Sequence, residues 1–271
     1  MKVGRTKGGG APALERLDRE FSACRLVLLG TVRGLVGEAS EVKAAFEALD
    51  PEAIALPIGP REREEIEETL KEKGVLPGVA GNRAAGRVKA PGPTGLAATR
   101  LPKDEDDSDF NDFGLFVSTS DMVFLRHLSR FGDVEMPPPA FQEALRLGIL
   151  NDVPVLEADF DDDGYTTVFL DNVSTMSLIK QGRRLRRLSK AKFKATDAAA
   201  FAREWDERLT RVKGYLNVER AREEKIASGI AAACQGRHRL LALVEAERMG
   251  GVLAALERMA AVLPAPAEGT G

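Results

Sequence analysis

Residues 24–58 read CRLVLLGTVRGLVGEASEVKAAFEALDPEAIALPI, and this stretch decides the fold. It begins with a short apolar run closed by glycine, Cys24–Gly30, which is typical of a buried parallel strand. Apolar residues then recur at the spacing of one helix face over Glu38–Leu49, and a second buried strand follows at Ala53–Ile58. A helix that connects two buried strands predicts a right-handed βαβ unit in a parallel sheet.

The same alternation of apolar runs and helical patterns continues toward the C-terminus. It predicts helices over 60–72, 120–131, 137–147, 198–213, 218–233 and 251–262, and strands over 153–159 and 239–244. Residues 165–176 fit either a strand or a helix. We therefore expect an α/β fold with a mostly parallel central sheet flanked by helices, and with long helices near the C-terminus.

The length of 271 residues suits one domain with less ordered appendages. Residues 1–20 are expected to form a flexible N-terminal arm and residues 263–271 a loose tail, on either side of a single domain over 21–262. Within that domain, residues 75–108 contain many glycines and prolines and almost no large apolar residues, which predicts a mobile loop.

Charge and composition exclude several classes of protein. The formal net charge is −3, so general affinity for nucleic acid is not expected. The two cysteines, Cys24 and Cys234, form no C-x-x-C pair, and two histidines are too few for a histidine-rich metal site. The basic N-terminus lacks the apolar centre of a signal peptide, and no apolar run approaches the ~18 residues of a membrane span. We predict a cytoplasmic protein with no membrane partner.

A basic run of seven arginines and lysines lies within residues 183–194. Nucleic acid and a membrane surface are the partners that such a run can serve. Phe193 is the one aromatic residue near it that could stack on a base, which argues against nucleic acid. The run is therefore predicted to be a solvated helix face.

Charged residues follow each predicted strand of the parallel sheet. Ligands of such sheets bind beyond the carboxyl ends of the strands, where loops and helix N-termini converge. Arg33 follows the first strand, Arg61 the second and Asp159 the third, while Glu245-Ala-Glu-Arg248 follows the last. These positions predict a polar site at one edge of the sheet.

The same strand ends resemble the TraB family, which includes TraB/PrgY, Tiki and GumN-like proteins. Gly30-Thr-Val-Arg33 lies on the family's Gly-Thr-x-His motif, and Glu245-Ala-Glu-Arg248 lies on its Gly-x-Gly-His motif. Glu135 lies on the family's glutamate motif, and Arg222 lies on its helical arginine, with Arg220 as the alternative register. The resemblance covers most of residues 24–262 outside the predicted loop.

The departures from the family pattern decide what the resemblance implies. Both motif histidines are arginines here, Arg33 and Arg248, and both glycines of the last motif are glutamates, Glu245 and Glu247. Some members of the wider family are described as metal-dependent proteases, but a guanidinium keeps its proton and cannot bind a metal ion. We expect no metal and no other cofactor. The two arginines could instead bind a carboxylate or phosphate, or pair with Glu135, Glu245 or Glu247.

Three functions remain open from the sequence. The first is a non-metallic binding or regulatory protein, a pseudoenzyme, that recognises an anionic small molecule or a peptide end through Arg33, Glu135, Arg222, Glu245, Glu247 and Arg248. Glu135, Arg222 and Glu247 are also the candidate catalytic residues. The alternative is a peptidase-like hydrolase in which Glu135, Asp159 and Glu247 bind magnesium or manganese. The third is a regulatory subunit that forms a homo-oligomer through its long helices over 197–234.

Overall fold

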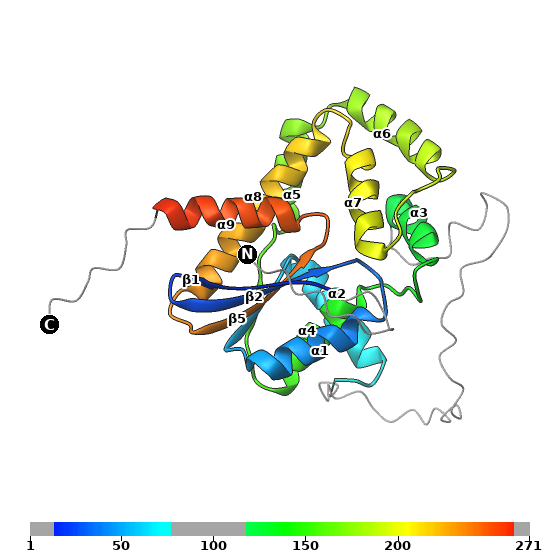
Figure 1. Ribbon diagram of the computed structural model, residues 1–271. Coiled ribbons are helices and arrows are strands. Elements are labelled where there is room, and N and C mark those ends of the chain that lie inside the picture. Colours follow the sequence, from blue (N-terminus) through cyan, green and yellow to red (C-terminus); the bar gives the residue numbers. More distant parts are fainter. Residues whose placement is uncertain (1–13, 77–117, 263–271) are drawn as a thin grey trace, which may run out of the picture.

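The structure is a computed structural model that describes residues 14–76 and 118–262 (Figure 1). The predicted mobile loop over 75–108 lies outside the described residues except for its first two positions. The predicted tail over 263–271 also lies outside them, as does most of the predicted N-terminal arm.

Within the described residues, five strands form one sheet in the order β1-β2-β5-β3-β4. Strands β2 (Cys24–Thr31), β5 (Arg239–Glu245), β3 (Ala53–Leu56) and β4 (Val155–Glu157) run parallel to one another, and β1 (Glu15–Phe21) is antiparallel to β2. Helices flank this sheet, so the predicted α/β fold with a mostly parallel sheet is confirmed.

Strand β1 lies where the sequence predicted a flexible arm, and for residues 15–20 that prediction was wrong. Each residue from Glu15 to Phe21 pairs with a residue of β2. Leu17 and Phe21 contribute to the core, while most of the other side chains of β1 are charged and exposed. Five of the seven residues of β1 are charged, so this edge strand lacks the continuous apolar run that identifies the buried strands.

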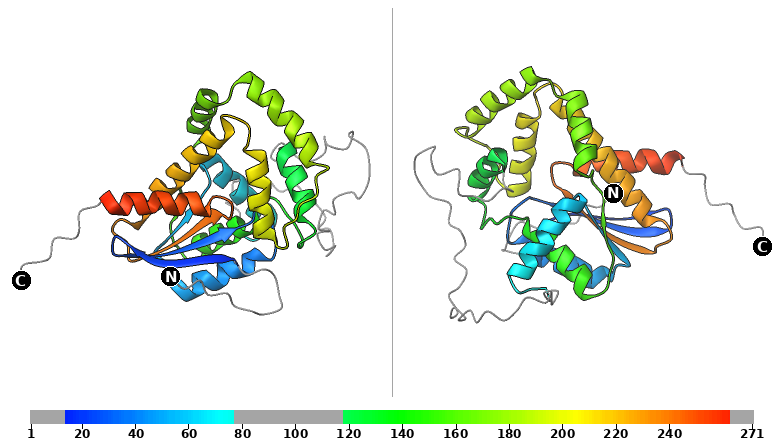
Figure 2. Two further views of the ribbon diagram at one scale, coloured as in Figure 1. Left: turned by 45° about the horizontal axis from the view of Figure 1, so that its top comes forward. Right: turned by 180° about the vertical axis from the view of Figure 1, so that it is seen from behind.

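Two layers of helices cover the two faces of the sheet (Figure 2). Helices α1 (Glu38–Leu49), α2 (Pro60–Glu72) and α4 (Pro139–Leu150) share one hydrophobic core with the sheet. Helices α8 (Tyr215–Cys234) and α9 (Met249–Val262) share a second core on the opposite face. The parallel strands are therefore buried on both sides.

Successive residues of each parallel strand face opposite layers. Val27 and Leu29 lie in the core with α1, α2 and α4, whereas Leu26 and Leu28 lie in the core with α8 and α9. Each buried side chain of this size contributes roughly 1.5–3 kcal/mol through removal from water. This two-sided burial is the physical reason for the unbroken apolar runs in the sequence.

A third group of helices packs against the loops at the carboxyl ends of β2 and β5 (Figure 1). It consists of α3 (Thr119–Leu128), α6 (Thr175–Leu188) and α7 (Ala198–Leu209), whereas α5 (Asp162–Asn172) packs against α8. Its core is aromatic: the ring centroids of Phe124 and Phe201 are 5.3 Å apart, and that of Trp205 is 5.7 Å from Phe124. We call α3, α6 and α7 the helical cap.

The ambiguous residues 165–176 are helical, since they span most of α5 and the start of α6. None of the helices that the structure describes has the length and apolar character needed to cross a membrane.

Candidate functional site

Arginines and carboxylates meet between the carboxyl edge of the sheet and the helical cap. Arg33 lies two residues beyond β2, and Arg248 lies in the turn between β5 and α9. Arg222 is on α8, the helix that leads from the cap to the face of the sheet (Figure 1). Strand ends of a parallel sheet meet at one edge, which explains why residues so distant in the sequence converge.

Arg248 is the most deeply buried of these arginines, with 6% of its side chain exposed. Its Nη1 donates to Glu245 Oε1 at 2.6 Å, and its Nε and Nη2 donate to Glu219 Oε2 at 2.9 and 2.6 Å. The predicted pairing of Arg248 with Glu245 is confirmed. Burial opposes the ionised form of Glu219, but Arg248 and Arg222 outweigh burial and lower the pKa of Glu219.

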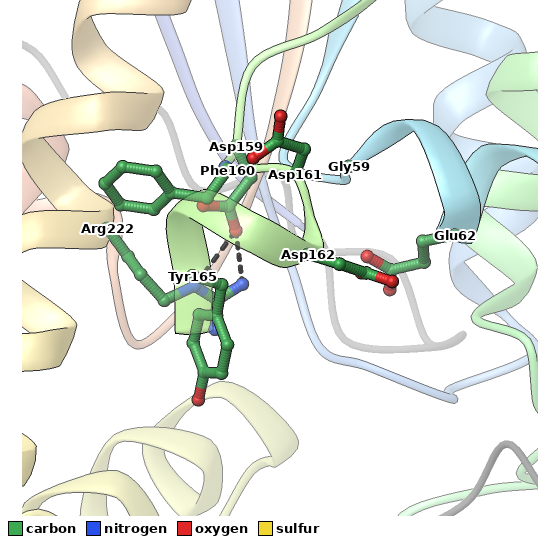
Figure 3. A pocket seen from close by; sticks show the side chains of 8 residues that line it. All are labelled: Gly59, Glu62, Asp159, Phe160, Asp161, Asp162, Tyr165 and Arg222. Atoms are coloured by element: carbon green, nitrogen blue, oxygen red, sulfur yellow. Dashed lines mark hydrogen bonds and ion pairs between the residues drawn. The ribbon is translucent and has the colours of Figure 1, made fainter. Parts of the chain in front are cut away.

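Arg222 binds Asp159, which follows β4. Its Nε donates to Asp159 Oδ2 at 2.9 Å, and its Nη2 bonds to the same oxygen (Figure 3). The other carboxylate oxygen, Oδ1, accepts from the backbone N–H of Phe160 at 2.8 Å. The guanidinium lies 5.8 Å from the centre of the Tyr165 ring, a cation–π contact. Asp159 and Tyr165 therefore fix the head of Arg222.

Arg33 is held more loosely than the other two arginines. Its Nη1 donates to Asp121 of α3 at 3.3 Å, and its Nε lies 3.9 Å from Glu247 Oε1. Among the described residues, this buried Nε has no hydrogen-bond partner. We call Arg33, Arg222 and Arg248, with Asp121, Asp159, Glu219, Glu245 and Glu247, the charge network.

Glu135 takes different partners from those that the sequence suggested. Its carboxylate pairs with Lys73 and accepts from Gln142 at 3.2 Å. No hydrogen bond or ion pair between described residues connects it to Arg33, Arg222 or Arg248. The structure therefore does not bring the Glu135 carboxylate into the charge network. Arg220, the alternative register for the helical arginine, is exposed.

Burial leaves two carboxylate oxygens of the network without partners. Glu245 Oε2 and Glu247 Oε2 are both buried, and neither accepts a hydrogen bond from a described residue. Burial raises the pKa of Glu247, although the positive charges of Arg33 and Arg248 oppose the shift. For Glu247, the buried oxygen without a donor and the raised pKa favour a proton on the carboxyl group or a ligand that donates to it.

Sequence reasoning missed three further acidic residues beside the network: Glu38, Glu62 and Asp206. Burial raises the pKa of Glu38 to about 8, although both of its oxygens accept from the backbone N–H of Val32, at 2.8 and 3.0 Å. Burial, with the negative charges of Glu219 and Glu247, raises the pKa of Asp206 to about 7. Glu38 and Glu62 lie in the first turns of helices that follow strands, a position that could have identified them.

A cavity of about 190 Å³ opens beside Arg222 (Figure 3). Residues from the ends of β3 and β4 and from α2, α5 and α8 line it: Gly59, Glu62, Asp159, Phe160, Asp161, Asp162, Tyr165 and Arg222. Four of these residues are acidic, and Arg222, the arginine among them, already binds Asp159.

Glu62 is the cavity residue with the clearest chemical signature. Glu62 lines the cavity, where protein atoms surround a side chain that stays accessible to water. Those surroundings, together with the negative charge of Glu245, raise its pKa to about 7, although Arg222 and Arg33 oppose the shift. Glu62 can therefore gain or lose a proton near neutral pH.

The carboxylates proposed as metal ligands are already engaged with different cations. Glu135 pairs with Lys73, Asp159 pairs with Arg222, and Glu247 lies nearest to Arg33. Across residues 14–76 and 118–262, no three histidine, cysteine, aspartate or glutamate side chains are grouped in a way that could hold a metal ion.

The chemistry of this edge follows from its excess of acidic groups. The arginines are largely neutralised by their partners, whereas several carboxyl groups have pKa values raised toward neutrality. Such a site can store protons, donate hydrogen bonds from carboxylic acids and bind a positively charged group.

No family model and no curated protein matches this chain. The resemblance to the TraB family therefore remains a prediction from the motifs.

Proposed function

We propose that the chain is a binding protein for a small ligand with an amino or guanidino group, held in the acidic cavity beside Arg222. The observation that carries this proposal is the composition of the cavity, which has four acidic side chains and one arginine. Asp159 pairs with Arg222 and Asp162 pairs with Arg61, so Glu62 and Asp161 supply the remaining negative charge. The amino end of a peptide is one such group. The proposal thus keeps the peptide end that the sequence suggested and reverses its expected charge.

The pairing of the arginines argues against an anion in the same place. To bind an anion, Arg248 would have to leave Glu245 and Glu219, of which Glu245 is almost fully buried. Removing one partner of a buried ion pair costs on the order of 3–5 kcal/mol, because the other charge is left uncompensated. Arg33 favours the anionic ligand as a second candidate, because its buried Nε has no partner among the described residues.

Binding of a cation to this cavity should release protons. A positive charge beside Glu62 favours its ionised form, and the pKa of Glu62 is about 7 in the free protein. Affinity should therefore rise as the pH rises through neutrality. Between pH 6 and pH 8 we expect a gain of roughly tenfold, since about one proton must leave at the lower pH.

Two probes of equal length and opposite charge test the sign of the ligand. 1,4-Diaminobutane and succinate should be compared by thermal unfolding and isothermal titration calorimetry. We expect the diamine to bind and raise the unfolding temperature, and to release protons when the titration is repeated in buffers of different ionisation enthalpy. A ligand at a hundred times its Kd stabilises a protein by about 2.7 kcal/mol.

Glu62→Gln should weaken diamine binding by roughly tenfold and abolish its pH dependence, as the loss of one charge-assisted hydrogen bond implies. Glu68→Gln is the matched control, since Glu68 is exposed on the same helix and does not line the cavity. Binding of succinate without diamine would contradict the proposal and favour the anionic ligand. Stoichiometric binding of manganese would instead favour the hydrolase alternative.

A further inference from the structure

The outward side of α6 is apolar in its first half. Met176, Leu178 and Ile179 are 57, 45 and 47% exposed, and Leu170 at the end of α5 is 71% exposed. Only Ser177 and Leu188 of α6 are buried. Met176 and Ile179 are three residues apart, so these two exposed apolar side chains lie on one side of the helix.

The second half of α6 and the residues after it are basic. Lys180, Arg183, Arg186, Arg187 and Lys190 are exposed, and no ion pair with a described carboxylate involves any of them.

Several exposed arginines elsewhere on the molecule are paired with carboxylates. Arg61 pairs with Glu65 and Asp162, Arg211 pairs with Glu207, and Arg258 pairs with Glu224. Exposed cations without a described ion pair also occur elsewhere, for example Arg126 and Arg220, but in the α6 region five of them lie within residues 180–190.

The apolar and basic halves lie on one face of the helix. Met176, Ile179, Arg183 and Arg186 follow one another at intervals of three and four residues, so they share one side of α6. The opposite side packs against α3 and α7, and α6 lies at the outer margin of the helical cap (Figures 1 and 2). We call Met176, Ile179, Arg183, Arg186 and Arg187 the α6 face.

We propose that the α6 face binds the surface of an anionic lipid bilayer. Met176 and Ile179 enter the headgroup region, and Arg183, Arg186 and Arg187 contact lipid phosphates. Apolar side chains beside unpaired cations on an outlying helix are the combination that interfacial helices use. Each arginine near a negatively charged bilayer contributes about 1 kcal/mol, and this contribution falls with salt.

Other occupants fit the α6 face less well. Nucleic acid without sequence preference is held by aromatic stacking as well as charge, and α6 contains no aromatic residue. A spanning helix is not required for this contact, because the chain lies on the bilayer rather than across it. The sequence alone predicted a solvated basic face, since it could not show that Met176 and Ile179 stay uncovered beside it.

Vesicle co-sedimentation tests the proposal with the full chain. The wild-type protein should sediment with phosphatidylcholine vesicles that contain about a third phosphatidylserine, and not with phosphatidylcholine alone. Raising the salt from about 0.1 to 0.5 M should release most of it. Failure to sediment with the anionic vesicles at low salt would overturn the proposal, as would equal binding to both kinds of vesicle.

Two variants test the basic and the apolar residues of the α6 face separately. The triple variant Arg183→Glu, Arg186→Glu, Arg187→Glu should lose at least tenfold in vesicle affinity, because three favourable charges become unfavourable. The double variant Met176→Asp, Ile179→Asp should lose binding as well. All five side chains are exposed, so circular dichroism and the unfolding temperature should match the wild type.

The matched control is the triple variant Lys43→Glu, Arg211→Glu, Arg258→Glu, which changes the net charge equally at exposed positions outside the face. It should retain vesicle binding. Equal loss in the control would show that net charge alone is responsible and would overturn the assignment to α6. Binding of an RNA homopolymer by wild type, in place of anionic vesicles, would also overturn it.

Discussion

Replacement of Glu38 by glutamine should remove much of the pH dependence of stability between pH 6 and pH 8. Glu38 is 3% exposed at the start of α1, and burial raises its pKa from 4.5 to about 8. In this window the unfolded chain has lost the proton while the native protein still holds it. The unfolded state binds fewer protons, so stability falls as the pH rises.

The two pKa values set the size of the effect. The buried Glu38 lowers the free energy of unfolding progressively as the pH rises above about 4.5. The full loss is reached above about pH 8. At ~1.36 kcal/mol per pKa unit, the full loss is about 5 kcal/mol, of which about 2 kcal/mol falls between pH 6 and pH 8. Glutamine keeps an oxygen to accept from Val32 N–H but does not titrate.

Urea denaturation at pH 6, 7 and 8, followed by the fluorescence of Trp205, measures this difference. The wild-type protein should lose about 2 kcal/mol more than Glu38→Gln over the range. Glu41→Gln, on the exposed side of the same helix, should behave as wild type. Parallel pH profiles for wild type and Glu38→Gln would refute the idea that Glu38 is protonated in the native state.

Three further predictions concern the charge network and the fold. Arg248→Ala should lose about 3–5 kcal/mol of unfolding free energy, partly recovered by adding Glu245→Gln; a wild-type urea midpoint for the single variant would contradict the buried pairing. Gly214→Ala should lower the unfolding temperature, with backbone strain alone costing about 1–2 kcal/mol. Gly214 has a φ of +96°, and an added Cβ would lie 2.2 Å from Asn172 O, so an unchanged temperature would contradict this geometry. Protein purified without chelator should contain no stoichiometric zinc, cobalt or manganese by elemental analysis, because arginines occupy both motif-histidine positions; about one ion per chain would contradict that.

The buried parts of the fold could be predicted from sequence because burial leaves a periodic signal. The strands around Leu26–Leu29 and Leu240–Leu243 are apolar on both faces, and the helix over Glu38–Leu49 has the bounds that its pattern suggested. The two helices predicted over 198–213 and 218–233 are also separate in the structure, and Gly214 lies between them. By contrast, β1 is an edge strand with few apolar residues, and the sequence leaves the start of α6 open between strand and helix because only Ser177 and Leu188 of this helix are buried.

The candidate site could be predicted only where it depends on chain order. Arg33, Glu245 and Arg248 follow strands, so the topology of a parallel sheet is enough to bring them to one edge. Glu219 and Asp206 lie inside helices, and which turn of a helix faces the edge is set by tertiary packing. For Glu135, chain order gave the right position and the wrong partner. Its backbone N–H donates to the carbonyl oxygen of Gly34 in the loop after β2, but its carboxylate turns to Lys73.

The pairing of β1 with β2 has a practical consequence for anyone who shortens the chain. Unpaired strand edges are templates on which other copies of a protein add, and each edge of this sheet is protected. Strand β1, whose exposed side chains are mostly charged, forms one edge and covers the main chain of β2, and at the other edge Arg63 donates to the carbonyl oxygen of Val155 in the three-residue strand β4. Removal of residues 1–21 as a dispensable leader would uncover the main chain of β2 and the apolar side chains that Leu17 and Phe21 shield. The product of that truncation should aggregate during expression, whereas removal of residues 1–13 leaves the edge closed.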